Sequence, residues 1–106
     1  MDQTHYQSKS QMKRVEKQQE ADAFIKEKKI NEIKKRWEDS QLKAATMQSV
    51  LGYMVEQYTE HRDELSAEIV TQTEAQISLR RTEIEDFLML EQKICLEALE
   101  EHAKLN

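Results

Sequence analysis

Proline is absent from this sequence of 106 residues, and glycine occurs only once, at Gly52. Turns usually recruit Gly, Pro, Asn and Asp, so a chain with so little Gly and Pro has few places at which to reverse. A phosphate-binding loop also needs several glycines close together. The composition therefore argues against a compact domain with many turns and against an enzyme that binds nucleotides.

The sequence has one cysteine, Cys95, which excludes an intrachain disulfide and a zinc framework. We expect a reducing, intracellular compartment. Cys95 and His102 share a predicted helix face, but two ligands are too few for a metal site. Carboxylates are abundant on predicted exposed faces, where they make poor general acids at neutral pH. We therefore expect a protein that is not an enzyme and that binds no cofactor or metal.

Long apolar runs are also missing, and none approaches the length of about 18 residues that spans a membrane. Residues 1–10, MDQTHYQSKS, are polar and lack the apolar core of a signal peptide. We interpret them as a flexible polar N-terminal arm. The expected location is the cytoplasm or the cytoskeleton, with no part of the chain embedded in a membrane.

Charged residues make up 35% of the sequence, and good helix formers such as Glu, Lys, Gln, Ala and Leu dominate it. We predict an all-α protein in which residues 11–106 form two or three extended amphipathic helices without a compact globular core. Intervals of three and four residues place one apolar set on a single helix face. Its members are Phe24, Ile25, Ile30, Ile33, Trp37, Ala44, Met47, Leu51, Met54 and Tyr58, and the same phase is predicted to continue through His61, Leu65 and Ile69.

Two positions are candidate breaks in this helical region. Near 39–41, Asp39 or Ser40 is able to cap a following helix. Near 70–76 the apolar phase slips, and Thr71–Glu74 fits a capping box. A reversal there would make an antiparallel pair, although the lack of Gly and Pro at that point argues against it. Whether the helices are straight, bent or hairpinned stays open.

The stretch Ile77–Leu99 organises the rest of the chain. Its apolar residues recur at intervals of three, four and seven and so share one helix face: Ile77, Ile84, Phe87, Leu88, Cys95 and Leu99. Acidic residues cover much of the remaining surface. A helix of this kind has no core of its own, so it must lie against another surface.

Charge is distributed unevenly along the chain. Residues 1–40 carry ten Lys or Arg and eight Asp or Glu, whereas residues 41–106 carry six and thirteen. Within residues 26–36 there are six basic and two acidic residues. A formal net charge of −5 argues against general nucleic-acid binding, but the basic block is suited to a short contact with an acidic surface.

Two features have more than one interpretation. Trp37 follows three cations and is either an interface anchor or part of a helix–helix seam. Arg80 and Arg81 either bind carboxylates of a partner or form exposed bridges to nearby glutamates of this chain.

The C-terminal pattern of Arg80, Arg81, Ile84, Phe87, Leu88, Glu91, position 95 and Leu99 resembles the tail of small cilia- and flagella-associated proteins. These are microtubule inner proteins, which bind the inside wall of axonemal doublet microtubules. The upstream pair Arg36-Trp37 is similar to an element of one small member of that group. The sequence departs from the pattern at Cys95, where an aromatic residue is usual, and in lacking a Gly after Leu99.

This resemblance implies a non-enzymatic helical protein that binds tubulin and neighbouring ciliary microtubule-associated proteins and stabilises the axonemal lattice. It implies no nucleic-acid, membrane or small-molecule partner. The residues that it marks as contact candidates are Arg36, Trp37, Arg80, Arg81, Ile84, Phe87 and Leu88. The alternative hypothesis is a coiled-coil adaptor or oligomerisation subunit of a larger cytoplasmic assembly. The irregular apolar seam favours an irregular partner over self-pairing.

Overall fold

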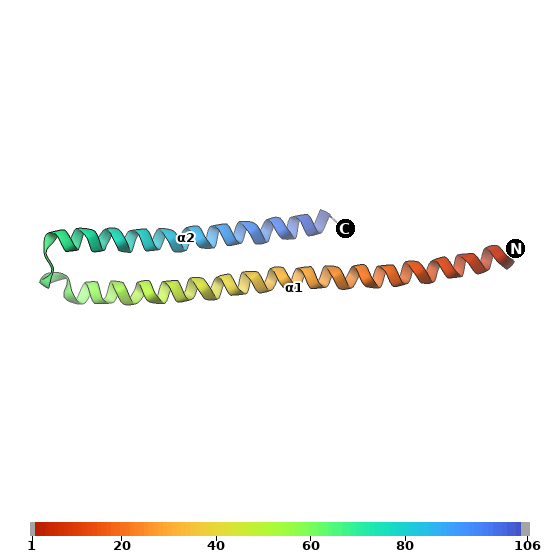
Figure 1. The fold of residues 1–106 in the computed structure, drawn as a ribbon, viewed down its shortest axis with the longest axis horizontal. Coiled ribbons are helices and arrows are strands. Elements are labelled where there is room, and N and C mark those ends of the chain that lie inside the picture. The colour runs from red at the N-terminus through yellow and green to blue at the C-terminus, as the bar shows by residue number, and fades with distance from the viewer. Residues whose placement is uncertain (1, 105–106) are drawn as a thin grey trace.

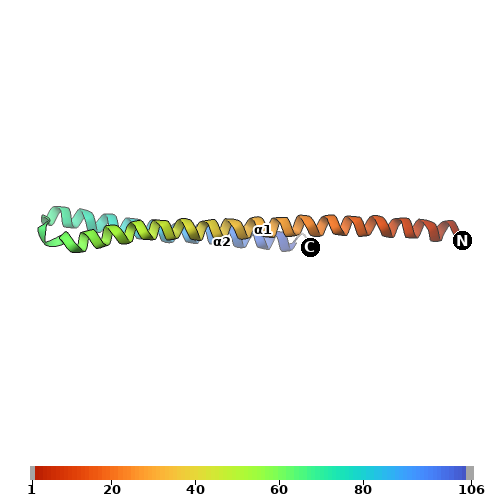
Figure 2. The same cartoon turned by 90° about the horizontal axis from the view of Figure 1, so that it is seen from below.

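The computed structural model describes the backbone of residues 2–104 and the side chains of residues 11–104. Over that range the chain forms two α-helices, α1 (Asp2–His61) and α2 (Ala67–Lys104), joined by a short 3-10 turn, η1 (Arg62–Glu64). The helices lie antiparallel, and α1 extends well beyond the end of α2 (Figures 1 and 2). The hairpin measures 95 × 18 × 10 Å. The prediction of an all-α, extended protein is confirmed.

The seam of α1 follows strict heptads. Two sets of residues, each spaced by seven, are buried or half-buried against α2. They are Ile30, Trp37, Ala44, Leu51 and Tyr58, and Ile33, Ser40, Met47 and Met54. One heptad before Ile30 and Ile33 the same positions hold Ala23 and Lys26, so the apolar seam stops there. The buried face of α2 ends at the same point along α1, where His102 lies beside Lys29 and Ile33.

The seam of α2 is less regular. One set is spaced by seven: Val70, Ile77, Ile84, Glu91 and Ala98. The second set is Thr73, Leu88, Cys95 and His102. Leu88, Cys95 and His102 are spaced by seven, but Leu88 lies one position later than two heptads after Thr73. This shift in the heptad spacing of α2 falls at Arg80 and Arg81, both of which are exposed. Beyond them the buried strip is wider, since Phe87 is also half-buried.

The interior of the hairpin is small. Among the described side chains, the apolar residues that are buried are Ala44, Leu51, Ile84 and Cys95, which are between 3% and 8% exposed. Many larger apolar side chains remain in contact with solvent. Two helices in contact have only one mutual face, so most of each helix surface stays open. This agrees with the prediction that the chain has no compact globular core.

The expected break near 39–41 is absent, because α1 runs through it without interruption. Ser40 does not cap a helix. Its Oγ donates a hydrogen bond of 2.8 Å to the carbonyl oxygen of Arg36 one turn earlier, within the helix. The candidate break near 70–76 lies within α2, which already begins at Ala67, so the chain reverses into an antiparallel pair a few residues earlier than that position. There Thr71 Oγ1 donates to the carbonyl oxygen of Ala67 at 3.0 Å, in the same intrahelical manner.

The reversal is instead made by residues 62–66. The backbone N–H of Ile69 donates to Ser66 Oγ at 3.3 Å, so Ser66 is the N-cap of α2. Leu65 and Val70, both half-buried, occupy the two positions that form a hydrophobic staple around such a cap. Leu65 has extended backbone angles (φ −94°, ψ 149°). Over residues 2–104 no residue has a positive φ, so the turn requires neither Gly nor Pro.

The early end of α1 overturns one further expectation. The seam does not continue through His61, Leu65 and Ile69, because α1 ends at His61. His61 is exposed, and its Nδ1 lies 3.2 Å from Glu64 Oε2 in the turn. Gly52 lies within α1, and a methyl group added there would meet nothing within 4 Å. It is therefore a tolerated glycine and not a point of close approach. The backbone of residues 2–10 is the first part of α1, so the separate N-terminal arm expected over residues 1–10 is not seen as an element apart from the helix. The flexibility expected of that stretch stays a prediction.

Candidate partner-binding surface

Arg36 and Glu91 tie the two helices together. Arg36 Nε donates to Glu91 Oε2 at 2.8 Å, and Arg36 Nη2 donates to Glu91 Oε1 at 3.3 Å. Ser40 Oγ lies 3.1 Å from the same Oε2. The Glu91 side chain is 15% exposed and that of Arg36 is 52% exposed. The hydrogen bond from Arg36 lowers the pKa of Glu91 and raises the pKa of Arg36.

Trp37 lies one residue further along, in the seam. With Ile33 and Leu99, among others, it lines an apolar groove of about 270 Å³ between the helices. Cys95 lies in the same groove. The upstream pair Arg36-Trp37 and the C-terminal pattern that includes Glu91, Cys95 and Leu99 are therefore in contact with each other. Packing within the hairpin accounts for the residue types at these positions.

Three of the remaining candidates from the sequence are apolar residues that lie in or beside the seam. Ile84 is buried in the seam, and Phe87 and Leu88 are half-buried. Lys43 Nζ lies 5.0 Å from the centre of the Phe87 ring, a cation–π contact across the helices.

Arg80 and Arg81, in contrast, are exposed. None of the ion pairs among residues 11–104 includes either of them. The bridges to Glu74, Glu83 or Glu85, which were one of the two interpretations from the sequence, are not formed. Arg80 and Arg81 are therefore candidates from the sequence that remain exposed.

The carboxylate of Glu74 already has two partners near the turn. It accepts a hydrogen bond of 2.8 Å from the Tyr58 hydroxyl and lies 3.6 Å from Arg62 Nη2. Burial, followed by the hydrogen bond to Glu74, raises the pKa of Tyr58. This cluster joins the two helices at the turn end, as Arg36 and Glu91 join them further along the hairpin.

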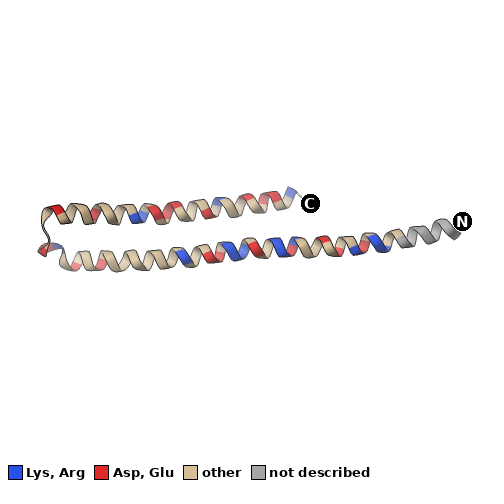
Figure 3. Ribbon diagram, viewed as in Figure 1, with Lys and Arg blue, Asp and Glu red and all other residues tan. Residues whose placement is uncertain are grey.

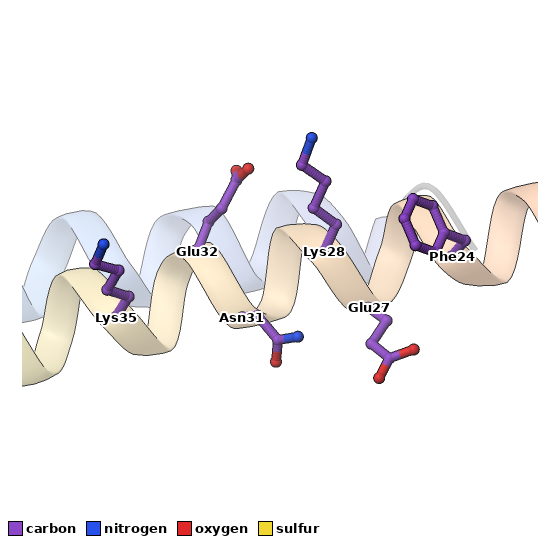
Figure 4. A pocket seen from close by; sticks show the side chains of 6 residues that line it. All are labelled: Phe24, Glu27, Lys28, Asn31, Glu32 and Lys35. Atoms are coloured by element: carbon purple, nitrogen blue, oxygen red, sulfur yellow. The ribbon is translucent and has the colours of Figure 1, made fainter.

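An exposed surface that the sequence analysis did not select lies on the opposite side of α1. We call it the outer stripe, made of Phe24, Lys28, Asn31 and Lys35. These residues follow one another at intervals of four, three and four, which aligns them along one side of the helix. In Figure 4 the α2 ribbon lies behind α1 and the four side chains lie on the near side. The Phe24 side chain is 67% exposed.

The sequence analysis placed Phe24 on the same face as Ile30, and that prediction is wrong, because the Phe24 side chain is exposed on the side of α1 away from α2. The heptad register was the signal that would have found the outer stripe. Counting back by seven from Ile30 gives Ala23 and not Phe24, so Phe24 is out of phase with the seam. A large apolar residue out of phase with the only seam of its helix has no place to be buried within the chain.

Metal and membrane sites have no support in the described part of the chain. Among the side chains of residues 11–104 there is no group of three or more His, Cys, Asp or Glu arranged to hold a metal ion. Cys95 and His102 both lie in the seam, and the buried Nδ1 of His102 has no hydrogen-bond partner. No helix in the same range combines the length and the apolar character needed to cross a bilayer.

Comparisons of the sequence with protein-family models and with curated proteins, and a comparison with solved structures, gave no match.

Proposed function

We propose that this chain is a non-enzymatic structural protein that binds tubulin in the lumen of ciliary doublet microtubules and stabilises the axonemal lattice. The proposal combines the resemblance described above with the shape of the hairpin. A rod 95 Å long and at most 18 Å wide exposes a surface that is long in one direction only. A filamentous lattice is a partner with matching geometry.

The observation that carries the proposal is the apolar surface left open along the whole rod. Large apolar side chains that are between 42% and 68% exposed occur on both helices. They include Leu42 and Tyr53 on α1, and Leu79, Met89 and Leu96 on α2. They are spread over the length of the hairpin and not gathered at one spot. An extended protein partner that lies along the rod would remove the apolar area of these side chains from water.

The contact candidates take different roles in this proposal. Arg80 and Arg81 are exposed and free of ion pairs among residues 11–104, so they are assigned to the partner, where a guanidinium pairs well with carboxylates. Arg36, Trp37 and Ile84 are assigned to the hairpin, which they hold in register. Phe87 and Leu88 are half-buried and contribute mainly to the seam.

The second candidate is a coiled-coil adaptor or oligomerisation subunit of a larger cytoplasmic assembly. The strict heptads of α1 favour a coiled coil, but α2 already occupies that seam. An adaptor would therefore have to use the outer faces of the hairpin. The two candidates differ in oligomeric state, since the lattice protein is expected to be monomeric without its partner.

Co-sedimentation with microtubules assembled from purified tubulin tests the proposal, together with rebinding to axonemes stripped by salt. The expected result is saturable binding to microtubules and a monomer in analytical ultracentrifugation. A stable dimer that melts sharply and does not sediment with microtubules would overturn the lattice proposal and favour the adaptor.

A further inference from the structure

A buried histidine lies where the C-terminal end of α2 packs against α1. His102 is 8% exposed, and no later residue in the described part of α2 is buried. Its ring borders a hollow of about 230 Å³ that Ile33 of α1 and Ala98 of α2 also line. The Nδ1 atom is buried and has no hydrogen-bond partner among residues 11–104. Buried polar atoms are usually paired, so the end of the hairpin contains an exception.

The charged groups around this ring come from both helices. Lys29 and Glu32 of α1 line the same hollow, and so does Glu101 of α2. All three are exposed, and no ion pair among residues 11–104 joins His102 to either carboxylate. Figure 3 shows charges of both signs at this end of α2 and on the adjacent part of α1. Within the described range none of them is paired with the imidazole.

Protonation changes what the Nδ1 atom requires. A neutral imidazole carries an N–H on one nitrogen and a lone pair on the other, whereas the charged form carries an N–H on both. An N–H added at Nδ1 of His102 meets no acceptor in the closed hairpin, and a buried donor without an acceptor is costly. If the end of α2 leaves α1, water supplies the missing acceptor.

We propose that His102 is a pH-sensitive latch, which holds the end of α2 against α1 while its ring is neutral and releases it when the ring is protonated. Histidine is the side chain whose charge ordinarily changes between pH 5 and pH 8. Because the released end accommodates the protonated ring and the closed end does not, falling pH shifts the equilibrium toward release.

The release is confined to residues 98–104. The pair of Arg36 and Glu91 lies about three turns earlier in α2 and holds the rest of the hairpin. Since the hydrogen bond from Arg36 lowers the pKa of Glu91, that carboxylate stays charged at pH 5. Leu99 forms part of the apolar groove in which Trp37 lies, so release of this segment also opens that groove to solvent.

The test follows this end of the full chain by NMR between pH 7.5 and pH 5. We expect the nuclear Overhauser contacts between the His102 ring and the Ile33 methyl groups to be lost at pH 5, while those between the helices near Leu51 are kept. Trp37 is the only tryptophan, and its fluorescence emission should shift to longer wavelength over the same range.

Three substitutions separate the latch from a general effect of acid. His102→Leu and His102→Gln take up no proton, and circular dichroism checks that each keeps the helix content. His61→Gln removes an exposed histidine from the end of α1 and is the matched control. We expect the shift of Trp37 emission with pH to be absent in both His102 variants and unchanged in His61→Gln.

Constant contacts and emission in the wild type from pH 7.5 to pH 5 would overturn the inference, and so would an equal shift in the His102 variants. Tighter attachment at pH 5 would overturn it as well, because it would mean that Glu32 or Glu101 pairs with the charged ring. The latch is independent of the proposed function, since co-sedimentation with microtubules is measured at neutral pH and its failure leaves these outcomes unchanged.

Discussion

Arg36 and Glu91 are separated by 55 residues in the sequence, yet two hydrogen bonds of 2.8 and 3.3 Å join their side chains across the hairpin. The same carboxylate also lies 3.1 Å from Ser40 Oγ. Glu91 therefore occupies a seam position at which its carboxylate is paired with Arg36 and lies beside the Ser40 hydroxyl. This arrangement specifies how far α2 is shifted along α1, because a slip of one turn would separate the pair.

The Glu91 ion pair makes hairpin stability depend on pH. The pKa of Glu91 is lower in the folded chain than in the unfolded chain, because Arg36 donates a hydrogen bond to the Glu91 carboxylate. The stabilisation is complete above the unfolded pKa of about 4.3 and is lost as pH falls through the lower folded value. We expect the difference in melting temperature between wild type and Glu91→Gln to shrink between pH 6 and pH 3, followed by circular dichroism. A difference that stays constant over this range would contradict a charged pair.

Gly52 offers a simple way to stabilise the protein. It lies inside α1, and an added methyl group would meet nothing within 4 Å. Since Ala is favoured over Gly in a helix interior, Gly52→Ala should stabilise the fold by about 1 kcal/mol. Urea unfolding gives the change in free energy. Destabilisation by this substitution would show that the fold requires a residue without a side chain at Gly52.

The position of the reversal is tested at two hydroxyls that could each mark the start of α2. Ser66→Ala removes the N-cap of α2 and should destabilise the hairpin by about 1 kcal/mol. Thr71→Ala removes only an intrahelical hydrogen bond and should change the stability by less than about 0.5 kcal/mol. Both are measured by urea unfolding under the same conditions. A larger effect at Thr71 than at Ser66 would return the helix start to the capping box expected from the sequence.

The contrast between Trp37 and Phe24 separates the seam from the outer stripe. Trp37→Ala should destabilise the hairpin by about 2 kcal/mol, less than the loss at a fully buried site, because the ring is half-buried. Phe24→Ala should change stability by less than about 0.5 kcal/mol, since its ring is mostly in solvent. Free energies of unfolding in urea measure both. The reverse order of effects would place Phe24, and not Trp37, in the seam.

Much of the fold could be predicted from local chemistry. The helix formers and the near absence of Gly and Pro required helices, and the spacing from Ile30 to Tyr58 identified the buried face of α1. The same reasoning found Ile84 and Cys95 in α2. Such patterns are readable because the side of a helix on which a residue lies depends only on its position in the sequence.

The reversal and the contacts across it could not be predicted in this way. Residues 62–66 turn the chain with ordinary backbone angles, so they carry no Gly or Pro signal, and Ser66 resembles several other hydroxyl residues of the sequence. The seam role of Glu91 depends on a partner in the other helix, which no local pattern specifies. Trp37 had two interpretations from sequence, and the groove that it shares with Leu99 places it in the seam.

The intrinsic preferences of the residues thus determined that this protein is helical and which faces are apolar. The packing of α1 against α2 decided which of those faces is buried and which, like the outer stripe, stays exposed. The physical reason is that helix propensity acts between near neighbours in the chain. Burial instead depends on where distant residues meet, and here that is decided by the turn at Ser66 and the pairing of Arg36 with Glu91.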